Sequence, residues 1–416
     1  MEIKRDHYVD LLINRKHNGL IKVITGIRRC GKSYLLFRLF NQHLLDSGVK
    51  EDHIVKIAFD MRKNTDLRDP DNVCAFIDEQ IKDSDMYYLL LDEVQMLSDF
   101  ESVLNEFLHY ENVDIYVTGS NSRFLSTDVL TEFRGRGDEV HVYPLTFSEY
   151  LSVYDGNIVK AWEEYYTFGG LPQLCLMNTD EQKNEYLCHL IDEVYIKDLI
   201  ERNNVRHSSE LSELVDILAS SIGSLTNPTK LAKTFKSVKN VSVTSNTISK
   251  YIEYLEQAFI IRKAVRYDIK GKKYIGTPTK YYFEDVGLRN ARLNFRQTEE
   301  NHIMENIIYN ELRYRGFNVD VGVVEVRGRK DNTYTRKQYE VDFVANLGNR
   351  RYYVQSAYAM NNDEKRIQET QSLRGIDDSF KKIIVVKDDI KIRRDENGFV
   401  TMGIFEFLTN PGSLEL

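Results

Sequence analysis

The stretch LIKVITGIRRCGKSYLLFRLF, residues 20–40, decides the fold of this chain. Leu20–Thr25 is almost entirely apolar or β-branched, as expected for a strand that is covered on both faces. The next eight residues, GIRRCGKS at 26–33, fit the phosphate-loop pattern G-x-x-x-x-G-K-[S/T] without a mismatch. Apolar residues at helical spacing follow over Tyr34–Phe40. A strand, a phosphate-binding loop and a helix are therefore predicted in direct succession.

The loop offers groups that suit a nucleoside triphosphate. Its glycines let successive backbone N–H groups point inward, and the start of the following helix adds the positive end of a dipole. Lys32 is expected to reach the β and γ phosphates, and the Ser33 hydroxyl to ligate magnesium. A glycine-rich turn with a chance lysine is the alternative, which the flanking strand and helix disfavour. The predicted ATP-binding residues are Gly26, Ile27, Arg28, Arg29, Cys30, Gly31, Lys32, Ser33 and Tyr34.

A second informative stretch, MYYLLLDEVQ at residues 86–95, is an apolar run that ends in two carboxylates. Asp92 is predicted to complete the magnesium shell with Ser33, and Glu93 to polarise the attacking water. Two adjacent carboxylates at the end of a buried strand cost desolvation energy unless a cation and hydrogen bonds compensate for the lost water. The alternative is a strand that ends in an exposed acidic turn. Behind a phosphate loop, the pattern favours Lys32, Asp92 and Glu93 as catalytic residues of Mg²⁺-dependent ATP hydrolysis.

Two further catalytic residues are predicted downstream, Ser120 and Arg136. In P-loop proteins with a catalytic Glu, the sensor strand, here Val113–Thr118, lies between the phosphate-loop strand and the carboxylate strand. Ser120 and Asn121 would then face the nucleotide, although a helix cap explains Asn121 equally well. Arg136 stands in a loop where arginine can neutralise transition-state charge, in the same chain or from a neighbouring subunit. A surface arginine is its alternative.

Length and composition indicate a multidomain protein of the cytoplasm. A chain of 416 residues is expected to form two to four domains, and 42% hydrophobic with 29% charged residues is ordinary for a globular protein. No apolar run is long enough to span a membrane, and the charged N-terminus does not read as a secretory signal. Four scattered cysteines without a C-x-x-C pair disfavour zinc and disulfides. With a net charge of −8, nucleic-acid contact would need a local basic patch.

The order of the elements predicts four domains. Alternating strands and helices over 1–154 predict an α/β fold: a P-loop NTPase parallel sheet with helices on both faces. A helical bridge follows over 155–204. Three helices and a β-hairpin over 205–295 predict a winged helix. Mixed elements over 296–416 predict a second α/β domain.

The predicted winged helix has a mixed charge pattern. Lys250 on its third helix and the lysines of the turn 270–273 are placed to contact DNA phosphates. Glu253 and Glu256 lie on the same helix and would repel a phosphate backbone. DNA and a protein partner therefore both remain open.

The last segment outlines a restriction-endonuclease-like core. The residues that suggest it are Glu305, Glu340, Asp342 and Gln355. The lysine expected two positions after Gln355 is replaced by Ala357, so nuclease activity is not expected. Salt bridging of the carboxylates with Arg350 or Arg351 is the preferred alternative.

Together these pieces resemble the bacterial and archaeal AAA-type ATPases that join an N-terminal P-loop domain to a C-terminal domain of unknown function. The matching stretches run through nearly the whole chain: GIRRCGKS, LLLDEVQ, YVTGSNS, RGR before VYPLTFSEYL, FGGLPQ, YIKDLIER, ISKYIEYLEQAFII, KYYFEDVGLRN, MENIIYNEL and YEVDFVANLGNRRYYVQSAY.

The resemblance implies phosphate-binding roles for Gly26, Gly31, Lys32 and Ser33, and the magnesium and water-activating roles for Asp92 and Glu93. It places Arg136 on the family's Gly-Arg position. It also implies a winged helix and a nuclease-like tail that usually lacks a full catalytic set. The hypothesis is an ATPase that moves its appended domains against DNA or a protein partner. The oligomeric state is left undecided, and a homo-oligomer is one of the alternatives. A nucleotide-regulated DNA-binding protein and an ATP-gated nuclease are the alternatives.

Overall fold

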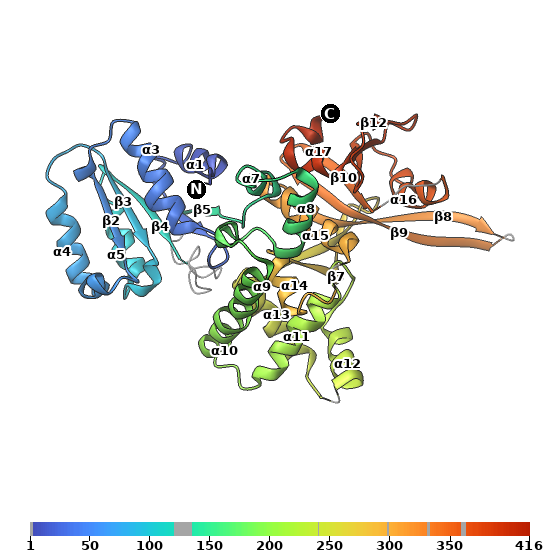
Figure 1. Cartoon of the computed structure of the whole chain (residues 1–416), viewed down its shortest axis with the longest axis horizontal. Helices are drawn as coiled ribbons and strands as arrows, with labels where there is room; N and C mark the ends of the chain where they lie inside the picture. The colour runs from blue at the N-terminus through green and yellow to red at the C-terminus, as the bar shows by residue number, and fades with distance from the viewer. Residues whose placement is uncertain (1–2, 120–134, 240, 298, 331–332, 359–362) are drawn as a thin grey trace. The chain divides into compact units, whose positions relative to one another are not determined.

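The computed structural model describes residues 3–119, 135–239, 241–297, 299–330, 333–358 and 363–416 (Figure 1). The chain forms two compact units. Unit 1 comprises Met1–Pro144, Leu171–Gln173 and Gln257–Phe259. Unit 2 comprises Leu145–Gly170, Leu174–Glu256 and Ile260–Leu416. The finer division into four domains stays a prediction.

Unit 1 is built on a parallel five-stranded sheet. The strand order is β2-β3-β4-β1-β5, and every neighbouring pair is parallel. The strands are β1 (Ile21–Thr25), β2 (Ile54–Ala58), β3 (Tyr87–Asp92), β4 (Val113–Thr118) and β5 (Gly137–His141). The predicted sensor strand β4 therefore does lie between the phosphate-loop strand β1 and the carboxylate strand β3. Because all carboxyl ends share one edge, the polar strand ends meet there.

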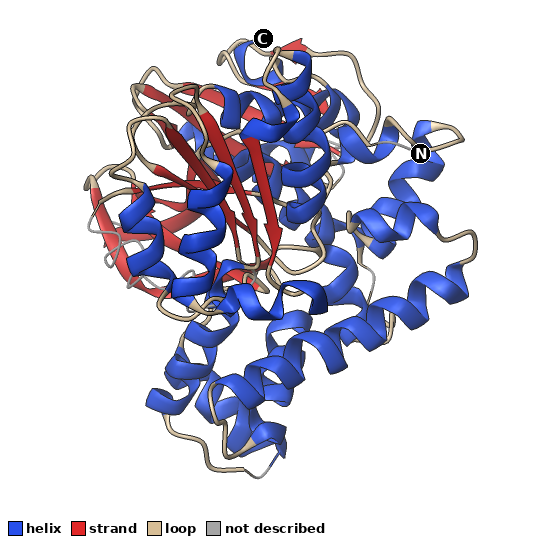
Figure 2. Ribbon diagram, turned by 90° about the vertical axis from the view of Figure 1, so that its left-hand side faces the viewer, coloured by secondary structure: helices blue, strands red, loops and turns tan. Residues whose placement is uncertain are grey.

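Helices flank this sheet on both faces, as predicted (Figures 1 and 2). The helices of unit 1 are α1 (Asp6–Ile13), α2 (Lys32–Tyr34), α3 (Asn41–Asp46), α4 (Pro70–Gln80) and α5 (Phe100–Phe107), with a π-helical turn, Leu35–Phe40, joining α2 to α3. Apolar residues of α4 and α5 form one core with the sheet. Phe40 packs on Tyr116 of β4, with ring centroids 4.6 Å apart. The Asp69 carboxylate caps the start of α4 by accepting hydrogen bonds from the Asp71 and Asn72 N–H groups.

The described α-helices of unit 2 lie before, between and after its strands along the chain. They are α7 (Phe147–Leu151), α8 (Ile158–Phe168), α9 (Asp180–His189), α10 (Lys197–Arg202), α11 (Ser208–Ser220), α12 (Pro228–Lys239), α13 (Ser245–Gln257), α14 (Val286–Arg292), α15 (Glu300–Tyr314), α16 (Asp363–Arg374) and α17 (Ile404–Thr409). A π-helical turn, Leu190–Ile196, joins α9 to α10. The predicted succession of three helices and a hairpin is present as α11, α12, α13, β6 (Ile261–Asp268) and β7 (Lys273–Phe283).

That hairpin is not a separate sheet. It is the end of an eight-stranded mixed sheet of order β12-β13-β11-β10-β9-β8-β6-β7. Strand β6 pairs in parallel with β8, and a single bridge joins Thr226 to Thr279 of β7. The remaining strands are β8 (Asn318–Lys330), β9 (Thr333–Leu347), β10 (Arg350–Ala357), β11 (Lys381–Val386), β12 (Arg393–Arg394) and β13 (Val400–Gly403). The winged-helix and nuclease-like assignments stay predictions.

The glycine pair 169–170 follows from the close packing of α8 against α14. Gly169 has φ of +80°, and a Cβ there would lie 2.3 Å from an Asp285 carboxylate oxygen. The Gly170 N–H donates a 2.8 Å hydrogen bond to the other oxygen of Asp285. A Cβ on Gly287 would lie 1.8 Å from the Phe168 carbonyl oxygen. Only glycine lets these backbones approach so closely.

Candidate nucleotide site

The phosphate loop leaves the carboxyl end of β1 in the curled form that the sequence predicts. Gly26 has φ of +138° and Gly31 has φ of +102°, conformations that favour glycine. A Cβ on Gly26 would lie 2.1 Å from the Val142 carbonyl oxygen. Arg29 also has a positive φ, +68°, and so contributes to the tight curl. The loop is thus shaped by its two glycines, and its backbone encloses a small concave cradle.

Lys32 lies inside this cradle rather than on the surface. Its side chain is buried, and its Nζ donates hydrogen bonds to the carbonyl oxygens of Gly26 (2.9 Å) and Ile27 (3.1 Å). A buried ammonium held by two carbonyls retains a third N–H donor. The loop therefore concentrates positive charge where backbone N–H groups also gather, which fits a polyphosphate.

Asp92 and Ser33 are brought together at the adjacent strand ends. The Ser33 hydroxyl donates a 2.9 Å hydrogen bond to Asp92 Oδ1. Burial raises the pKa of Asp92, and hydrogen bonds from Thr118 and Ser33 oppose that rise. A buried carboxylate beside a serine hydroxyl supplies the hard oxygen ligands that Mg²⁺ prefers. The structure thus places the two predicted magnesium ligands beside each other.

Thr118, which sequence reasoning did not single out, connects both carboxylate residues. Its hydroxyl donates to Asp92 Oδ1 and accepts a 3.1 Å hydrogen bond from the Glu93 backbone N–H. Glu93 has φ of +53°, an uncommon conformation for a residue with a side chain. Its carboxylate accepts a hydrogen bond from the Gln95 amide. Both acids are thus held by neighbours on β4 and on the turn after β3.

These residues fit a magnesium–nucleotide complex. The cradle and Lys32 would hold the phosphates, and Ser33 with Asp92 would hold the ion. The ion would supply charge neutralisation at the phosphate oxygens. Glu93 then provides a carboxylate beside the ion-binding residues, as water activation requires.

Of the other two predicted catalytic residues, the structure describes Arg136 but not Ser120. Ser120, with Asn121, falls outside the described residues. Arg136 lies at the amino end of β5, where its carbonyl oxygen accepts a hydrogen bond from the Ile21 N–H. Its guanidinium donates to Asn105 Oδ1 at 3.1 Å. This is the sheet edge opposite the phosphate loop, so the position does not support action within its own chain. A role toward a neighbouring subunit stays a prediction.

Arg5 is a second residue that the sequence did not reveal. Its guanidinium donates to the carbonyl oxygens of Cys30 in the phosphate loop (3.2 Å) and of Tyr143 (2.7 Å). The Tyr8 hydroxyl accepts a 2.9 Å hydrogen bond from the Tyr143 N–H. The start of α1 therefore holds the loop against the segment after β5. No local pattern marks these contacts, because the partners lie far away in the sequence.

The carboxylates that suggested a nuclease-like core lie together in unit 2. Lys280 of β7 reaches them, with Nζ 2.9 Å from Glu305, 2.7 Å from Glu340 and 3.9 Å from Asp342. Asp342 Oδ2 accepts a 2.8 Å hydrogen bond from the Ser356 N–H. Ala357 is buried in the apolar core. Among the described residues, the salt-bridge partner of these acids is Lys280 rather than the expected Arg350 or Arg351, and Arg350 pairs with Glu415 at 3.7 Å instead.

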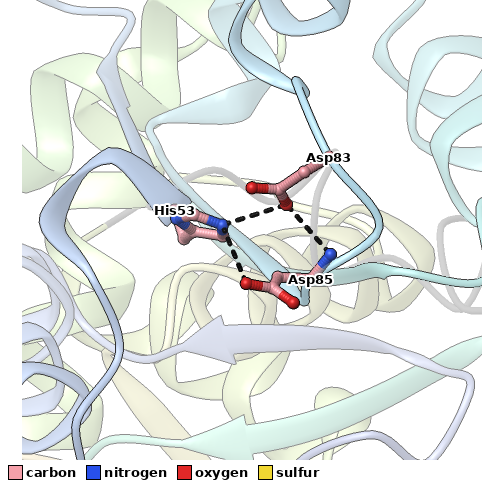
Figure 3. Close-up of side chains that lie close together, drawn as sticks. All are labelled: His53, Asp83 and Asp85. Atoms are coloured by element: carbon pink, nitrogen blue, oxygen red, sulfur yellow. Dashed lines mark hydrogen bonds and ion pairs between the residues drawn. The ribbon is translucent and has the colours of Figure 1, made fainter.

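A third polar cluster lies at the amino edge of the unit 1 sheet (Figure 3). His53 Nε2 is 3.1 Å from Asp83 and 3.8 Å from Asp85, and its Nδ1 is 2.9 Å from Asp52. The hydrogen bond to Asp52 raises the pKa of His53. Lys50 also pairs with Asp85 at 3.3 Å. The cluster is accounted for as a set of ion pairs, on the edge opposite the phosphate loop.

Comparison with known proteins agrees with the geometry of unit 1. Residues 18–151 match the family described as an AAA domain, and residues 159–299 match a domain of unknown function, DUF8612. A Walker-type ATPase of Pyrococcus abyssi has a similar solved structure, with a TM-score of 0.50 and 16% identity. The match covers 70% of this chain and 96% of that one. The fold of a P-loop ATPase is therefore shared.

Among the described helices, none combines the length and apolar character that crossing a bilayer requires.

Two curated relatives match most of the chain. An uncharacterized protein of Methanocaldococcus jannaschii is 28% identical over 379 residues, which are 87% of this chain and 79% of that protein. An uncharacterized protein of Haemophilus influenzae is 32% identical over 389 residues, 92% of this chain and 93% of that protein. The chain therefore belongs to the family of this Haemophilus influenzae protein, and it carries an AAA domain.

Proposed function

We propose that this protein binds ATP with Mg²⁺ at the phosphate loop of unit 1 and hydrolyses it. The observation that carries the proposal is the convergence of Lys32, Ser33 and Asp92 at the carboxyl edge of the sheet. Phosphate binding alone needs only the loop. Glu93, which follows Asp92 and is held by Thr118 and Gln95, adds the carboxylate that hydrolysis needs.

The nucleotide state would in turn control how unit 2 engages a partner. In proteins of this architecture, hydrolysis and product release commonly set when a partner is let go. The three helices and the hairpin of unit 2 form the predicted winged helix, the module proposed to meet that partner. An oligomer in which Arg136 serves the site of a neighbouring subunit is part of the same proposal.

Two substitutions test the ATPase. Lys32→Ala removes the cradle's ammonium and is expected to abolish ATP binding, measured with a fluorescent ATP analogue. Glu93→Gln is expected to keep ATP binding while lowering phosphate release by roughly 10²-fold or more, because the general base is lost. Lys56→Ala, at an exposed lysine of β2, is the matched control and should behave as wild type. Equal turnover in wild type, Lys32→Ala and Glu93→Gln would refute the enzyme assignment.

A further inference from the structure

Helix α12 and the first turns of α13 in unit 2 lie in a part of the sequence whose charged residues are all basic. Residues 217–252 contain five lysines and neither aspartate nor glutamate, although the whole chain has a net charge of −8. The five lysines are Lys230, Lys233, Lys236, Lys239 and Lys250. A basic window in an acidic protein is the local patch that contact with a polyanion requires.

Helix α12 presents its lysines along one side. Lys230, Lys233 and Lys236 are exposed and recur every third residue, so they follow one stripe of the helix. Leu231 and Phe235 are buried on the other side. Lys230 donates one hydrogen bond to the Leu225 carbonyl oxygen, and an ammonium has two further donors. The stripe is therefore a row of cationic side chains anchored by an apolar face.

Helix α13 presents polar side chains in its first turns. Ile248 and Ile252 are buried, whereas Asn246, Ser249 and Lys250 are exposed on the opposite side. The Thr244 hydroxyl accepts a hydrogen bond from the Thr247 N–H at 3.1 Å and so caps the helix start. The exposed face thus offers amide, hydroxyl and ammonium groups in succession.

The acidic residues that counted against nucleic acid lie further along α13. Glu253 is exposed, and it lies one turn after Ser249, beyond the polar stretch that includes Asn246. Glu256 is half-buried, and burial raises its pKa while Lys263 and Arg262 act in the opposite direction. Neither glutamate belongs to the first two turns, so the repulsion is confined to the far end of the helix.

Two grooves flank those first turns. One, of about 460 Å³, is lined among others by Asn227, Lys230, Lys233 and Ser249. The other, of about 320 Å³, is lined among others by Arg206, Asn246, Thr247 and Lys250. Every charged side chain that lines either groove is cationic. The first turns of α13 therefore project between two basic grooves. A helix that enters the major groove of DNA needs the same arrangement, because a phosphate strand lies on each side of it.

We propose that this surface binds duplex DNA, with the first turns of α13 in the major groove and the lysines of α12 on the phosphate backbone. The major groove admits an α-helix, and asparagine and serine side chains can bond to base edges there. Phosphate contacts by lysine would set the affinity and the register. Lys270 of the hairpin turn pairs with Asp377 at 3.2 Å, so one cation of the turn already has an acidic partner. The proposal does not depend on ATP hydrolysis.

The test is titration of the full-length protein into a fluorescein-labelled 20-base-pair duplex, followed by anisotropy, without nucleotide. With four lysines on phosphates, the dissociation constant is expected to rise roughly 100-fold between 50 and 200 mM salt. A variant that combines Lys230→Ala, Lys233→Ala and Lys236→Ala should bind the duplex more weakly. Its slope of log K against log salt should be shallower by about 2.7. Alanine keeps the helix propensity of these exposed positions.

The matched control carries Lys56→Ala, Lys160→Ala and Lys391→Ala, three exposed lysines outside this surface, and should bind as wild type. Equal binding by the α12 variant and wild type would overturn the proposal. So would tighter binding of single-stranded DNA, or equal competition by polyglutamate, which would indicate an acidic protein partner. Lys32→Ala should still bind the duplex, so failure of the ATPase proposal is recognised separately.

Discussion

Thr118 illustrates how much of the nucleotide site depends on single hydroxyl groups. The Asp92 carboxylate is buried, and its described hydrogen bonds come from Ser33 and Thr118. The Thr118 hydroxyl also accepts a hydrogen bond from the Glu93 N–H, so one side chain positions the predicted ion ligand and the predicted base. A catalytic carboxylate gains from fixed geometry, since small displacements cost rate. Thr118 is therefore a positioning residue for both acids.

Thr118→Val keeps the shape of the side chain and removes both hydrogen bonds. We expect ATP turnover to fall about 10-fold or more and ATP affinity to stay close to wild type. The lost hydrogen bonds also lower the free energy of unfolding by about 1–3 kcal/mol, because a buried carboxylate loses a partner. Phosphate release, nucleotide titration and thermal unfolding measure the three quantities. Thr118→Ser, which keeps the hydroxyl, is the control. If the valine and serine variants turn over ATP equally, Thr118 has no positioning role.

Sequence alone revealed the site residues that belong to a contiguous pattern of residues. Residues 26–33 are contiguous, so the pattern contains the whole loop, and Asp92 is marked by the apolar run before it. Thr118 and Arg5 carry no such mark, because their partners are up to 138 residues away and depend on strand order. Arg136 shows the converse: its local motif gives no position, and the structure places it at the amino end of β5, away from its own chain's phosphate loop. Its catalytic role toward a neighbouring subunit stays a prediction.

Among the elements, the α/β order of unit 1 was predictable because β1 and β3 are almost continuous apolar runs, followed by the phosphate loop and by the acidic pair. The position of β4 between β1 and β3 was predicted from the sensor-strand pattern, and the structure confirms it. The junction of β6 with β8 was not predictable, since a hairpin pattern shows its own pairing and not its edge partner. Helix α16 was also missed, because its polar sequence DEKRIQETQSLR shows no apolar stripe.

The packing of α8 on α14 creates a pH-dependent contact. Burial raises the pKa of Asp285 to about 6, although the N–H groups of Gly170, Leu288 and Gly287 act in the opposite direction. Between the ordinary value of 3.8 and about 6, the folded chain therefore keeps a proton that the unfolded chain has lost. This contribution to stability is full below about pH 4 and declines as the pH rises to about 6.

Asp285→Asn removes this titration. We expect the free energy of unfolding of unit 2 in wild type, minus that in the variant, to fall by about 2.5 kcal/mol between pH 4 and pH 7. Denaturant titrations at several pH values measure the difference. Asp388→Asn, at an exposed aspartate, controls for the change of charge. A difference that is constant over this range would show that Asp285 does not titrate in the folded protein.

At the scale of the whole chain, two compact units imply two unfolding transitions, so one free energy does not describe the protein. The polar cluster around Lys280 belongs to unit 2 and joins three of its elements: β7, α15 and β9. Nearby carboxylates raise the pKa of Lys280, which keeps the ammonium charged despite its burial. The negative charge of the three carboxylates is compensated by the single ammonium of Lys280. Removal of one member of a buried ion pair leaves uncompensated charge.

Lys280→Met keeps the side-chain volume and removes the charge. We expect the unfolding transition of unit 2 to lose about 3 kcal/mol or more, a fall of roughly 10 °C in its midpoint. The transition of unit 1 should be unchanged and should still shift upward with Mg²⁺ and ATP, because ligands stabilise only the folded state that binds them. Differential scanning calorimetry with and without nucleotide separates the two transitions.

Lys280→Met combined with Glu305→Gln supplies the control, since it removes one acid together with the ammonium. Partial recovery of the unit 2 midpoint is expected if the loss arises from unpaired carboxylates, whereas a packing defect would not be repaired by this change. The same variants separate a structural from a catalytic cluster. We expect wild type to show no Mn²⁺-dependent cleavage of plasmid DNA. Cleavage that disappears in both Lys280→Met and Asp342→Ala, with unit 2 still folded, would instead make Lys280 the missing lysine of an active nuclease.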